Sequence, residues 1–293
     1  MSKLRTQKSF QTNREVGTLY IVPTPIGNLE DITIRGLNTL KSVDLIAAED
    51  TRHTKKLLAH FEIHCPLTSY HEHSQKSKLE HLVNELLAGK QIALVSDAGM
   101  PGISDPGVLL IQAAIKQNID VIVLPGANAA LCALVGSGLS TEQFYFFGFL
   151  PRKNKDRKAA WQMLQLQQAT IILYESPYRL ITTLQDIKKY LGNRQIVLAR
   201  ELTKKYEEFV RGTVEEVLTW TESGAVKGEF CLVIEGNQAP ADVNPLWWEE
   251  LSVIDHVVHY IEEDGLTSKA AIKKVAEERG LKKRDVYQKY HVE

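Results

Sequence analysis

The stretch S-D-A-G-M-P-G-I-S-D-P-G, Ser96 to Gly107, directly follows the apolar run from Ile92 to Val95. It contains three Gly and two Pro residues. Gly tolerates positive φ and lets a ligand approach the backbone, while Pro fixes φ, so a buried strand here ends in a loop of defined shape. Open α/β sheets bind ligands at the carboxyl ends of their strands, and the loop therefore predicts a cofactor site. The same residue types also suit an ordinary strand-to-helix turn.

Three other apolar runs end in polar loops that contain Pro. Leu19–Val22 runs into P-T-P-I-G-N-L-E-D-I-T, Val121–Leu124 into P-G-A-N-A-A, and Ile171–Leu173 into Y-E-S-P-Y-R. Loops that follow several strands meet at one edge of a parallel sheet, so the pattern favours a single cleft built from several strand ends.

Helical and strand-like patterns alternate in the first half of the chain. Apolar residues recur at the three- and four-residue spacing of one helix face at Leu79, Leu82, Val83, Leu86 and Leu87. We expect a capping box from Ser77 to Glu80 to open this helix and Gly89 to close it. Strand-like runs flank it at Asp44–Ala48 and Ile92–Val95. Strand, helix and strand in repetition predict an α/β fold with a mostly parallel sheet.

A second set of strand-like runs follows the P-G-A-N-A-A loop. These runs are Phe144–Phe147, Ile171–Leu173, Ile196–Ala199, Glu208–Arg211 and Phe230–Ile234. Another helix is expected to start at Thr213 in T-V-E-E-V-L. We expect a flexible arm at 1–16, two α/β subdomains at 17–126 and 127–238 with the cofactor cleft between them, and a helical segment at 239–293.

Composition is typical of a soluble enzyme. With 35 Lys and Arg against 36 Asp and Glu, the net charge is −1, so any affinity for nucleic acid must come from local patches. The three cysteines lack framework spacing, which favours reduced thiols in the cytoplasm. The polar start, Met1 to Val16, has no apolar signal core, and no apolar run is long enough to span a membrane.

Several common sites are absent from the sequence. There is no G-x-G-x-x-G fingerprint and no G-x-x-x-x-G-K-[ST] loop, which argues against a nicotinamide enzyme and a P-loop NTPase. Cys65, Cys132 and Cys231 are too far apart for a local zinc motif. His71 and His73 either chelate a metal or lie in a solvated loop; without a third ligand spaced with them we favour the loop, and we expect no metal.

Two basic segments are candidates for RNA contact. Pro151–Lys158 has five Lys and Arg against one Asp, and after the preceding strand we expect it to be a flexible loop at the rim of the cleft. From Leu266 to Glu293 eight Lys and Arg stand against four Asp and Glu. There a helix from Thr267 or Ser268 to Glu278, a break at Gly280 and a helix at Asp285–Tyr290 are similar to a helix-turn-helix module. For Pro151–Lys158 we favour RNA contact over an exposed surface loop, whereas for the C-terminal segment a small helical cap with solvated charges is an equal alternative.

The ordered motifs resemble a known family. They are L-Y-I-V-P-T-P-I-G-N-L-E-D-I-T, A-A-E-D-T-R, S-D-A-G-M-P-G-I-S-D-P-G, P-G-A-N-A-A, F-G-F-L-P-R-K, L-Y-E-S-P-Y-R and A-R-E-L-T-K. In this order, from about Leu19 to Gly236, they resemble the bacterial small-subunit ribosomal RNA cytidine-2′-O-methyltransferases of the tetrapyrrole methylase superfamily. The resemblance implies two α/β subdomains and methyl transfer from S-adenosylmethionine to a ribose 2′-hydroxyl, with no metal. It also implies a homodimer acting on small-subunit ribosomal RNA, within the small ribosomal subunit.

The resemblance also implies the cofactor contacts. They carry over to Pro25, Ile26, Asp97, Gly99, Met100, Asn128, Ala129 and Tyr174. Asp97 is expected to accept a hydrogen bond from a cofactor hydroxyl or amine, and backbone groups near Met100 and Asn128 to contact the adenine or methionine end. Gly228 and Glu229, before the last strand, are weaker candidates.

The catalytic residues are expected among charged side chains at strand ends. These candidates are Asp50, Arg52, Arg200, Glu201 and Lys204. Asp50 or Glu201 would help remove the ribose proton, and Arg52, Arg200 and Lys204 would hold phosphate or stabilise the alkoxide. Equally, these charges could form internal ion pairs that hold the loops. Two other functions stay open: a methylase of a small, porphyrin-like molecule, and a non-catalytic RNA-binding protein.

Overall fold

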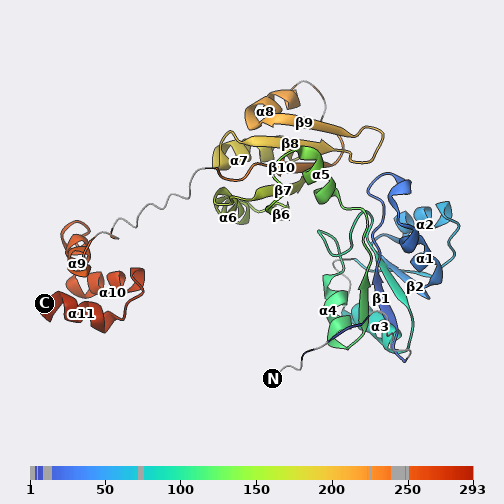
Figure 1. The fold of residues 1–293 in the computed structure, drawn as a ribbon, viewed down its shortest axis with the longest axis horizontal. Coiled ribbons are helices and arrows are strands. Elements are labelled where there is room, and N and C mark those ends of the chain that lie inside the picture. The colour runs from blue at the N-terminus through green and yellow to red at the C-terminus, as the bar shows by residue number, and fades with distance from the viewer. Residues whose placement is uncertain are drawn as a thin grey trace. The chain divides into compact units, whose positions relative to one another are not determined.

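The computed structural model describes residues 4, 6–8, 15–71, 76–222, 224, 226–238, 248 and 251–292. The chain divides into two compact units, Met1–Asn237 and Gln238–Glu293. Unit 1 contains two five-stranded sheets (Figure 1). Most of the expected arm at 1–16, together with His73, lies outside the described residues.

The first sheet of unit 1 is parallel throughout, in the order β3-β2-β4-β1-β5. Its strands are β1 (Thr18–Ile21), β2 (Leu45–Ala48), β3 (Leu67–Ser69), β4 (Ile92–Val95) and β5 (Asp120–Val123). The helices beside them are η1 (Leu29–Asp31), α1 (Ile34–Ser42), α2 (Thr51–His60), α3 (Lys76–Leu87) and α4 (Val108–Lys116). Leu19 pairs with Ile92 on one side and with Val121 on the other. All carboxyl ends therefore lie at one edge of the sheet.

Alternation along the strands builds a core on each face of this sheet. Leu19, Ile92 and Leu94 pack with α3 and α4 on one face. Ala93 and Val95 belong to the cluster of α1 and α2 on the other. A strand that is buried on both faces has apolar side chains at consecutive positions. For this reason β1 and β4 are recognisable in the sequence as continuous apolar runs.

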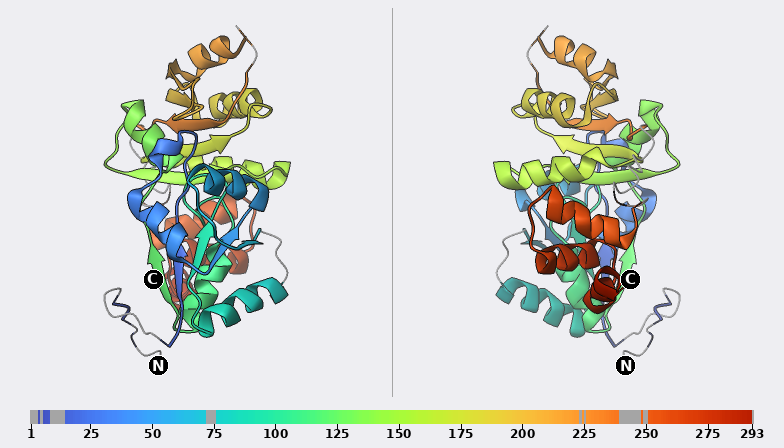
Figure 2. Two further views of the ribbon diagram at one scale, coloured as in Figure 1. Left: turned by 90° about the vertical axis from the view of Figure 1, so that its right-hand side faces the viewer. Right: turned by 90° about the vertical axis from the view of Figure 1, so that its left-hand side faces the viewer.

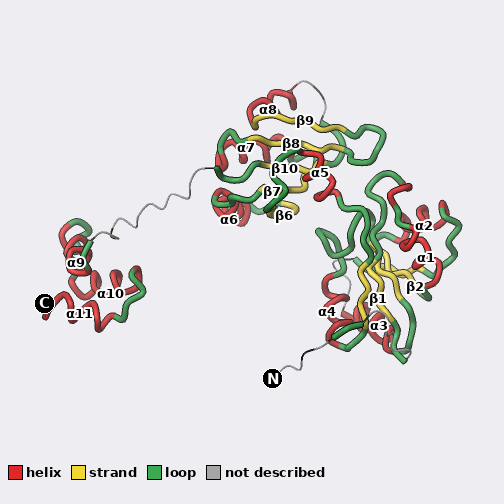
Figure 3. The backbone as a smooth tube through the Cα atoms, viewed as in Figure 1, coloured by secondary structure: helices red, strands yellow, loops and turns green. Residues whose placement is uncertain are grey.

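The second sheet of unit 1 is mixed, in the order β6-β7-β10-β8-β9. Its strands are β6 (Phe144–Phe149), β7 (Thr170–Glu175), β8 (Gln195–Arg200), β9 (Glu208–Thr213) and β10 (Phe230–Ile234). The helices are α5 (Ala129–Ser137), α6 (Asn154–Gln165), α7 (Leu180–Leu191) and α8 (Val214–Glu222). Strand β6 runs parallel to β7, whereas β10 is antiparallel to both of its neighbours. Figure 3 shows the strands of this sheet in yellow and the helices beside them in red.

Helix α5 covers the face of the second sheet that carries Ile172 and Val233, and packs there through Ala133 and Leu134. Helices α6, α7 and α8 pack on the opposite face, around the fully buried Trp161. The start of α8 is fixed by the T-x-x-E pattern, because Glu216 Oε2 accepts a hydrogen bond from Thr213 N at 2.7 Å.

Unit 2 contains three described helices, α9 (Val253–Glu262), α10 (Ser268–Glu278) and α11 (Lys283–Val292), which Figure 2 shows in orange and red. Val257, Ile272 and Val286 form their common core. Arg279 ties the loop before α9 to α10, since its Nη2 donates to Leu251 O at 2.6 Å and to Trp248 O at 2.8 Å. No helix among the described residues has the length and apolar composition that crossing a membrane requires.

Two local predictions need correction, and one strand was missed. The segment 154–158 is not a loop: it forms the first turns of α6, whose buried side carries Trp161 and Leu164 further along. Helix α3 already begins at Lys76, so Ser77 lies inside the helix rather than capping it. Strand β3 has three residues, which is too short for an alternating pattern, and it was not predicted.

Gly107 at the end of the S-D-A-G loop should not tolerate a side chain. Its φ is +149°, and an added Cβ would lie 3.0 Å from Leu94 Cδ2 and 3.2 Å from Gly102 N. We expect Gly107→Ala to lower the free energy of unfolding by about 2–3 kcal/mol, measured by urea denaturation. Gly138→Ala is the control, because Gly138 has φ +78° and no atom within 4 Å of its added Cβ. There we expect about 1 kcal/mol, and equal losses would contradict the crowding at Gly107.

Candidate functional site

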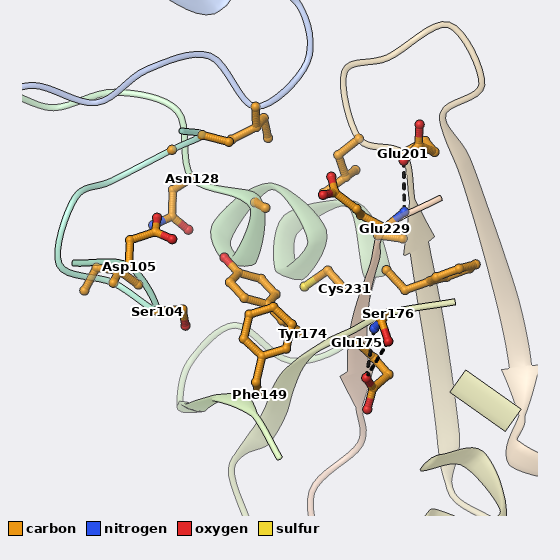
Figure 4. Close-up of a pocket in the computed structure, with 18 of the residues that line it drawn as sticks. Ser104, Asp105, Asn128, Phe149, Tyr174, Glu175, Ser176, Glu201, Glu229 and Cys231 are labelled. Carbon is orange, nitrogen blue, oxygen red and sulfur yellow. Dashed lines mark hydrogen bonds between the residues drawn. The ribbon is translucent and has the colours of Figure 1, made fainter. Parts of the chain in front are cut away.

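A cavity of about 410 Å³ lies in unit 1, lined by loops from both sheets (Figure 4). From the first sheet come Ile26, Ala98, Gly99, Met100, Ile103, Ser104 and Asp105. From α5 and the second sheet come Asn128, Ala129, Phe149, Tyr174, Glu175, Ser176, Pro177, Ala199, Glu201, Leu202, Lys204, Glu229, Phe230 and Cys231. The walls are largely apolar with a few polar groups, and the volume falls within the roughly 300–1,000 Å³ typical of small-molecule sites.

The loops after β1 and β4 are joined by a backbone bridge. Thr24 N donates to Gly99 O at 3.0 Å, and Gly99 N donates to Thr24 O at 2.9 Å. The hydroxyl of Thr24 also donates to Ser96 O at 3.0 Å. Gly99 has φ +80°, a conformation that favours glycine. This bridge places Ile26 and Met100 on the same wall of the cavity.

The loop after β1 also contacts the turn after β8. Asn28 N donates to the hydroxyl of Thr203 at 3.0 Å. A Cβ on Gly27 would lie 2.5 Å from Lys204 Cγ and 2.7 Å from Thr203 Oγ1, so only glycine allows this approach. Residues Glu201 and Thr203 adopt φ of +49° and +63°, which is uncommon for non-glycine residues. Such strained backbone is concentrated at functional sites.

An ion-paired cluster forms the wall made by β8 and β10. Lys204 Nζ lies 3.0 Å from Glu201 Oε1 and 2.8 Å from Glu229 Oε2. Burial raises the pKa of Glu201, but the hydrogen bonds from Glu229 N and Lys204 outweigh it, and the pKa is lowered. Burial lowers the pKa of Lys204, and its two carboxylate partners outweigh this effect and raise it. Both groups are therefore charged at neutral pH.

The N-terminal turn of α5 forms a further wall. Asn128 caps the helix by accepting from Leu131 N at 3.1 Å, and the hydroxyl of Tyr174 accepts from Ala130 N at 3.1 Å. Burial raises the pKa of Tyr174, so its hydroxyl stays protonated. In Figure 4 Tyr174 lies between Asp105 and Asn128 on one side and Glu229 on the other.

Asp105 differs from the other carboxyl groups that line the cavity. Glu201 and Glu229 pair with Lys204, and Glu175 lies 3.6 Å from Arg179 Nε. Asp105 forms no ion pair with any residue that the structure describes. Burial, and then the nearby carboxylate of Glu49, raise the pKa of Asp105 to about 7. The cavity therefore holds one carboxyl group that lacks a cationic partner from the described chain.

Most of the predicted cofactor residues line this cavity. They are Ile26, Gly99, Met100, Asn128, Ala129 and Tyr174. Pro25 and Asp97 do not line it, although each is next in sequence to a lining residue. Asp97 Oδ1 accepts from Asp50 N at 3.0 Å, and so joins the loops that follow β2 and β4. The weaker candidates divide as well, since Glu229 lines the cavity and Gly228 does not.

The predicted catalytic residues separate into two groups. Glu201 and Lys204 line the cavity, whereas Asp50, Arg52 and Arg200 do not. Asp50 caps α2 and pairs with Arg52 at 2.7 Å, and the side-chain hydrogen bond from Arg52 holds the pKa of Asp50 well below its usual range. Arg200 pairs with Glu208 at 2.9 Å. These three residues take part in ion pairs outside the cavity, and the Asp50–Arg52 pair lies at the surface.

Several lining residues were not predicted. Asp105 and Ser104 belong to the S-D-A-G loop itself, and Ser104 has φ +61°, but the sequence does not tell which Asp of the loop faces the cavity. Phe149 and Leu202 contribute apolar wall, and Cys231 is a buried thiol. In a strand, every second residue faces the same side, so Cys231 was identifiable in principle from the register of β10.

The described part of the chain offers no set of side chains for a metal site. No group of three or more His, Cys, Asp or Glu side chains there is arranged to hold a metal ion. His71 is described, but His73 lies outside the described residues. Cys65, Cys132 and Cys231 are free.

Comparison with known proteins identifies the family. Residues 18–218 match the family model of tetrapyrrole (corrin/porphyrin) methylases. The chain is 55% identical over 290 residues to ribosomal RNA small subunit methyltransferase I of Halalkalibacterium halodurans, covering 99% of this chain and 100% of that protein. It is 52% identical to the protein of the same name from Bacillus subtilis, covering 99% of each chain.

Solved structures share the fold of unit 1. One is uroporphyrin-III C-methyltransferase from Thermus thermophilus complexed with S-adenosylhomocysteine, with a TM-score of 0.54 at 16% identity over 75% of this chain and 97% of that one. At this identity the likeness concerns the fold alone. The family model matches most of unit 1, and the two relatives match almost the whole length of the chain. The chain therefore belongs to the tetrapyrrole methylase family, in the group of the ribosomal RNA small subunit methyltransferases I.

Proposed function

We propose that the protein transfers the methyl group of S-adenosylmethionine to the 2′-hydroxyl of a cytidine ribose in small-subunit ribosomal RNA. One observation carries this proposal: a chain related over 99% of its length to ribosomal RNA small subunit methyltransferases contains a cavity of about 410 Å³ built by its own motif loops. The choice of cytidine and of the 2′-oxygen rests on the motif resemblance. We also propose that the enzyme works in the cytoplasm on the small ribosomal subunit.

The lining residues suit S-adenosylmethionine. Ile26, Met100 and Leu202 supply apolar surface for an adenosine, and the α5 turn supplies polar groups beside it. The carboxyl group of Asp105, which has no cationic partner among the described residues, suits a ligand with cationic groups. Pro25 and Asp97 would act indirectly, by holding their loops. When bound, S-adenosylmethionine supplies an electrophilic methyl group on a sulfonium leaving group.

The chain's own residues then orient the ribose and receive its proton. Glu201 uses Oε1 for both of its hydrogen bonds to Lys204 and Glu229, and its Oε2 bonds to no described residue. We assign this free oxygen as the acceptor of the 2′-hydroxyl proton, with the paired ammonium of Lys204 stabilising the alkoxide as it develops. Arg52, whose side chain is 88% exposed, is suited to phosphate contact; Asp50 orients Arg52, and Arg200 holds the wall of β8 and β9.

We also propose that the enzyme is a homodimer. The described surface of unit 1 exposes large apolar side chains, including Leu109 on α4 at 61% and Val135 on α5 at 75%. Contact with a second copy of the chain would bury apolar side chains of this kind. Analytical ultracentrifugation tests this proposal. The sedimenting mass should be that of two chains, and the mass of one chain would contradict the dimer.

The proposed reaction can be tested by nucleoside analysis. Purified protein, labelled S-adenosylmethionine and small ribosomal subunits from cells that lack the enzyme should yield labelled 2′-O-methylcytidine. Glu201→Gln should lower the single-turnover rate about 10²- to 10³-fold, because it removes the proton acceptor. Glu222→Gln, a change at an exposed residue of α8, is the matched control and should leave the rate unchanged. Cofactor binding without any labelled RNA would instead favour the small-molecule methylase, and no cofactor binding would favour an RNA-binding protein.

Cofactor affinity should depend on pH through Asp105. Its pKa is raised to about 7 in the free protein, and a cation bound beside it favours the ionised carboxylate. Binding therefore releases a proton, so affinity should rise between pH 6 and pH 8 and then level off. Calorimetry with S-adenosylhomocysteine, whose ammonium group remains, can measure this change.

Asp105→Asn is the matching variant for this pH dependence. It keeps the shape of the side chain and removes the charge, so affinity should fall about 10-fold at pH 8 and should not vary across this pH range. A pH-dependent affinity that persists in Asp105→Asn would show that another group is responsible for it.

A further inference from the structure

Helix α11 of unit 2 presents a face that the fold itself does not use. Val286 is fully buried and Tyr290 packs against the core of unit 2, so these two residues mark the inner side of the helix. At about 100° per residue, Lys283, Arg284, Tyr287 and His291 lie together on the adjoining side. All four are exposed. We call this set the α11 face.

The α11 face combines aromatic rings with cations. The Tyr287 side chain is 53% exposed, and its ring centroid lies 4.4 Å from that of His291 with an interplanar angle of 50°. Lys283 and Arg284 lie one helical turn before Tyr287. Asp285, the acidic residue in the first turn of α11, lies about 160° around the helix from Tyr287, so it does not neutralise them.

The cations of the α11 face are not used in ion pairs within the described part of unit 2. The ion pairs there join Lys273 to Glu277 and Lys274 to Asp264, and the buried His256 ring lies 3.1 Å from Glu278 Oε2. None of them involves α11. The positive charge of Lys283 and Arg284 is therefore available to an anionic partner.

The connection before α11 has the form found in helix-turn-helix units. Gly280, two residues after the end of α10, has φ +62°, and Leu281 N donates to Ala276 O at 2.9 Å. Four residues, 279–282, separate α10 from α11. Nucleic-acid-binding units of this type present the helix after the turn to their ligand.

We propose that the α11 face binds a single-stranded segment of RNA, with an unpaired base stacked on Tyr287 and with phosphates against Lys283 and Arg284. Exposed Tyr and His rings stack on splayed bases, whereas a duplex offers no unstacked base to them. The face carries no aliphatic side chain, which argues against insertion into a lipid surface. That the bound RNA is the methylation substrate rests on the proposed function; RNA binding by the face does not.

Fluorescence anisotropy of the full chain with a labelled single-stranded oligoribonucleotide of mixed sequence tests this inference. Tyr287→Ala should weaken binding about 5- to 20-fold through loss of stacking, and Tyr287→Phe should restore most of it. Lys283→Gln combined with Arg284→Gln should reduce the slope of log affinity against log salt by about 1.4. Lys289→Gln is the matched control, because it removes one charge from the opposite side of the same helix and should change neither quantity.

Other readouts separate this inference from the proposed function. Calorimetric binding of S-adenosylhomocysteine should be unchanged in every α11 variant, since α11 belongs to unit 2 and the cavity to unit 1. If the native protein methylates RNA while the α11 variants bind the oligonucleotide as it does, the inference is overturned and the proposed function stands. If the native protein binds RNA through Tyr287 without methylating it, the inference stands and the proposed function fails. Equal competition by duplex RNA, or no RNA binding at all, also overturns the inference.

Discussion

The cavity of unit 1 depends on two backbone hydrogen bonds between Thr24 and Gly99, 3.0 and 2.9 Å long. They pair two loops that leave adjacent parallel strands, β1 and β4, and that would otherwise be free to diverge. Gly99 makes the pairing possible because its φ of +80° is one that other residues rarely adopt. Beyond the pair, Gly27 brings the same loop against Lys204 of the second sheet. The backbone therefore sets the shape of the cavity before any side chain contributes its chemistry.

Charged groups around the cavity divide into those that hold the loops and those that remain available to a ligand. Asp97 and Asp50 belong to the first kind, since an oxygen of Asp97 accepts from Asp50 N and Asp50 caps α2. Asp105 and Oε2 of Glu201 belong to the second, because Asp105 forms no ion pair with a described residue and Glu201 bonds to Lys204 and Glu229 through Oε1 alone. A partly buried carboxylate without a cationic partner is unfavourable unless a ligand supplies the positive charge. This division is why we assign chemistry to Asp105 and Glu201 and a positioning role to Asp50 and Asp97.

The sequence predicts the strands of this fold better than its site. Strand β4 has the predicted bounds, Ile92 to Val95, because a strand buried on both faces leaves a continuous apolar run. Helix α6 was missed because its first turns carry exposed basic residues and its buried Trp161 comes later. The S-D-A-G loop offers two Asp residues, and only the tertiary structure shows that Asp105 lines the cavity while Asp97 bonds to Asp50. Loop motifs identify where a site lies, but the side that each residue faces is set by contacts distant in sequence.

We propose that the cavity between the Thr24–Gly99 bridge and the Glu201–Lys204 pair binds the methyl donor. A crystal structure of the protein with S-adenosylhomocysteine would locate the ligand. We expect it between Met100 and Leu202, with its ammonium group within hydrogen-bond distance of the Asp105 carboxylate. A ligand bound elsewhere on the chain, or in the cavity with its ammonium group away from Asp105, would contradict it.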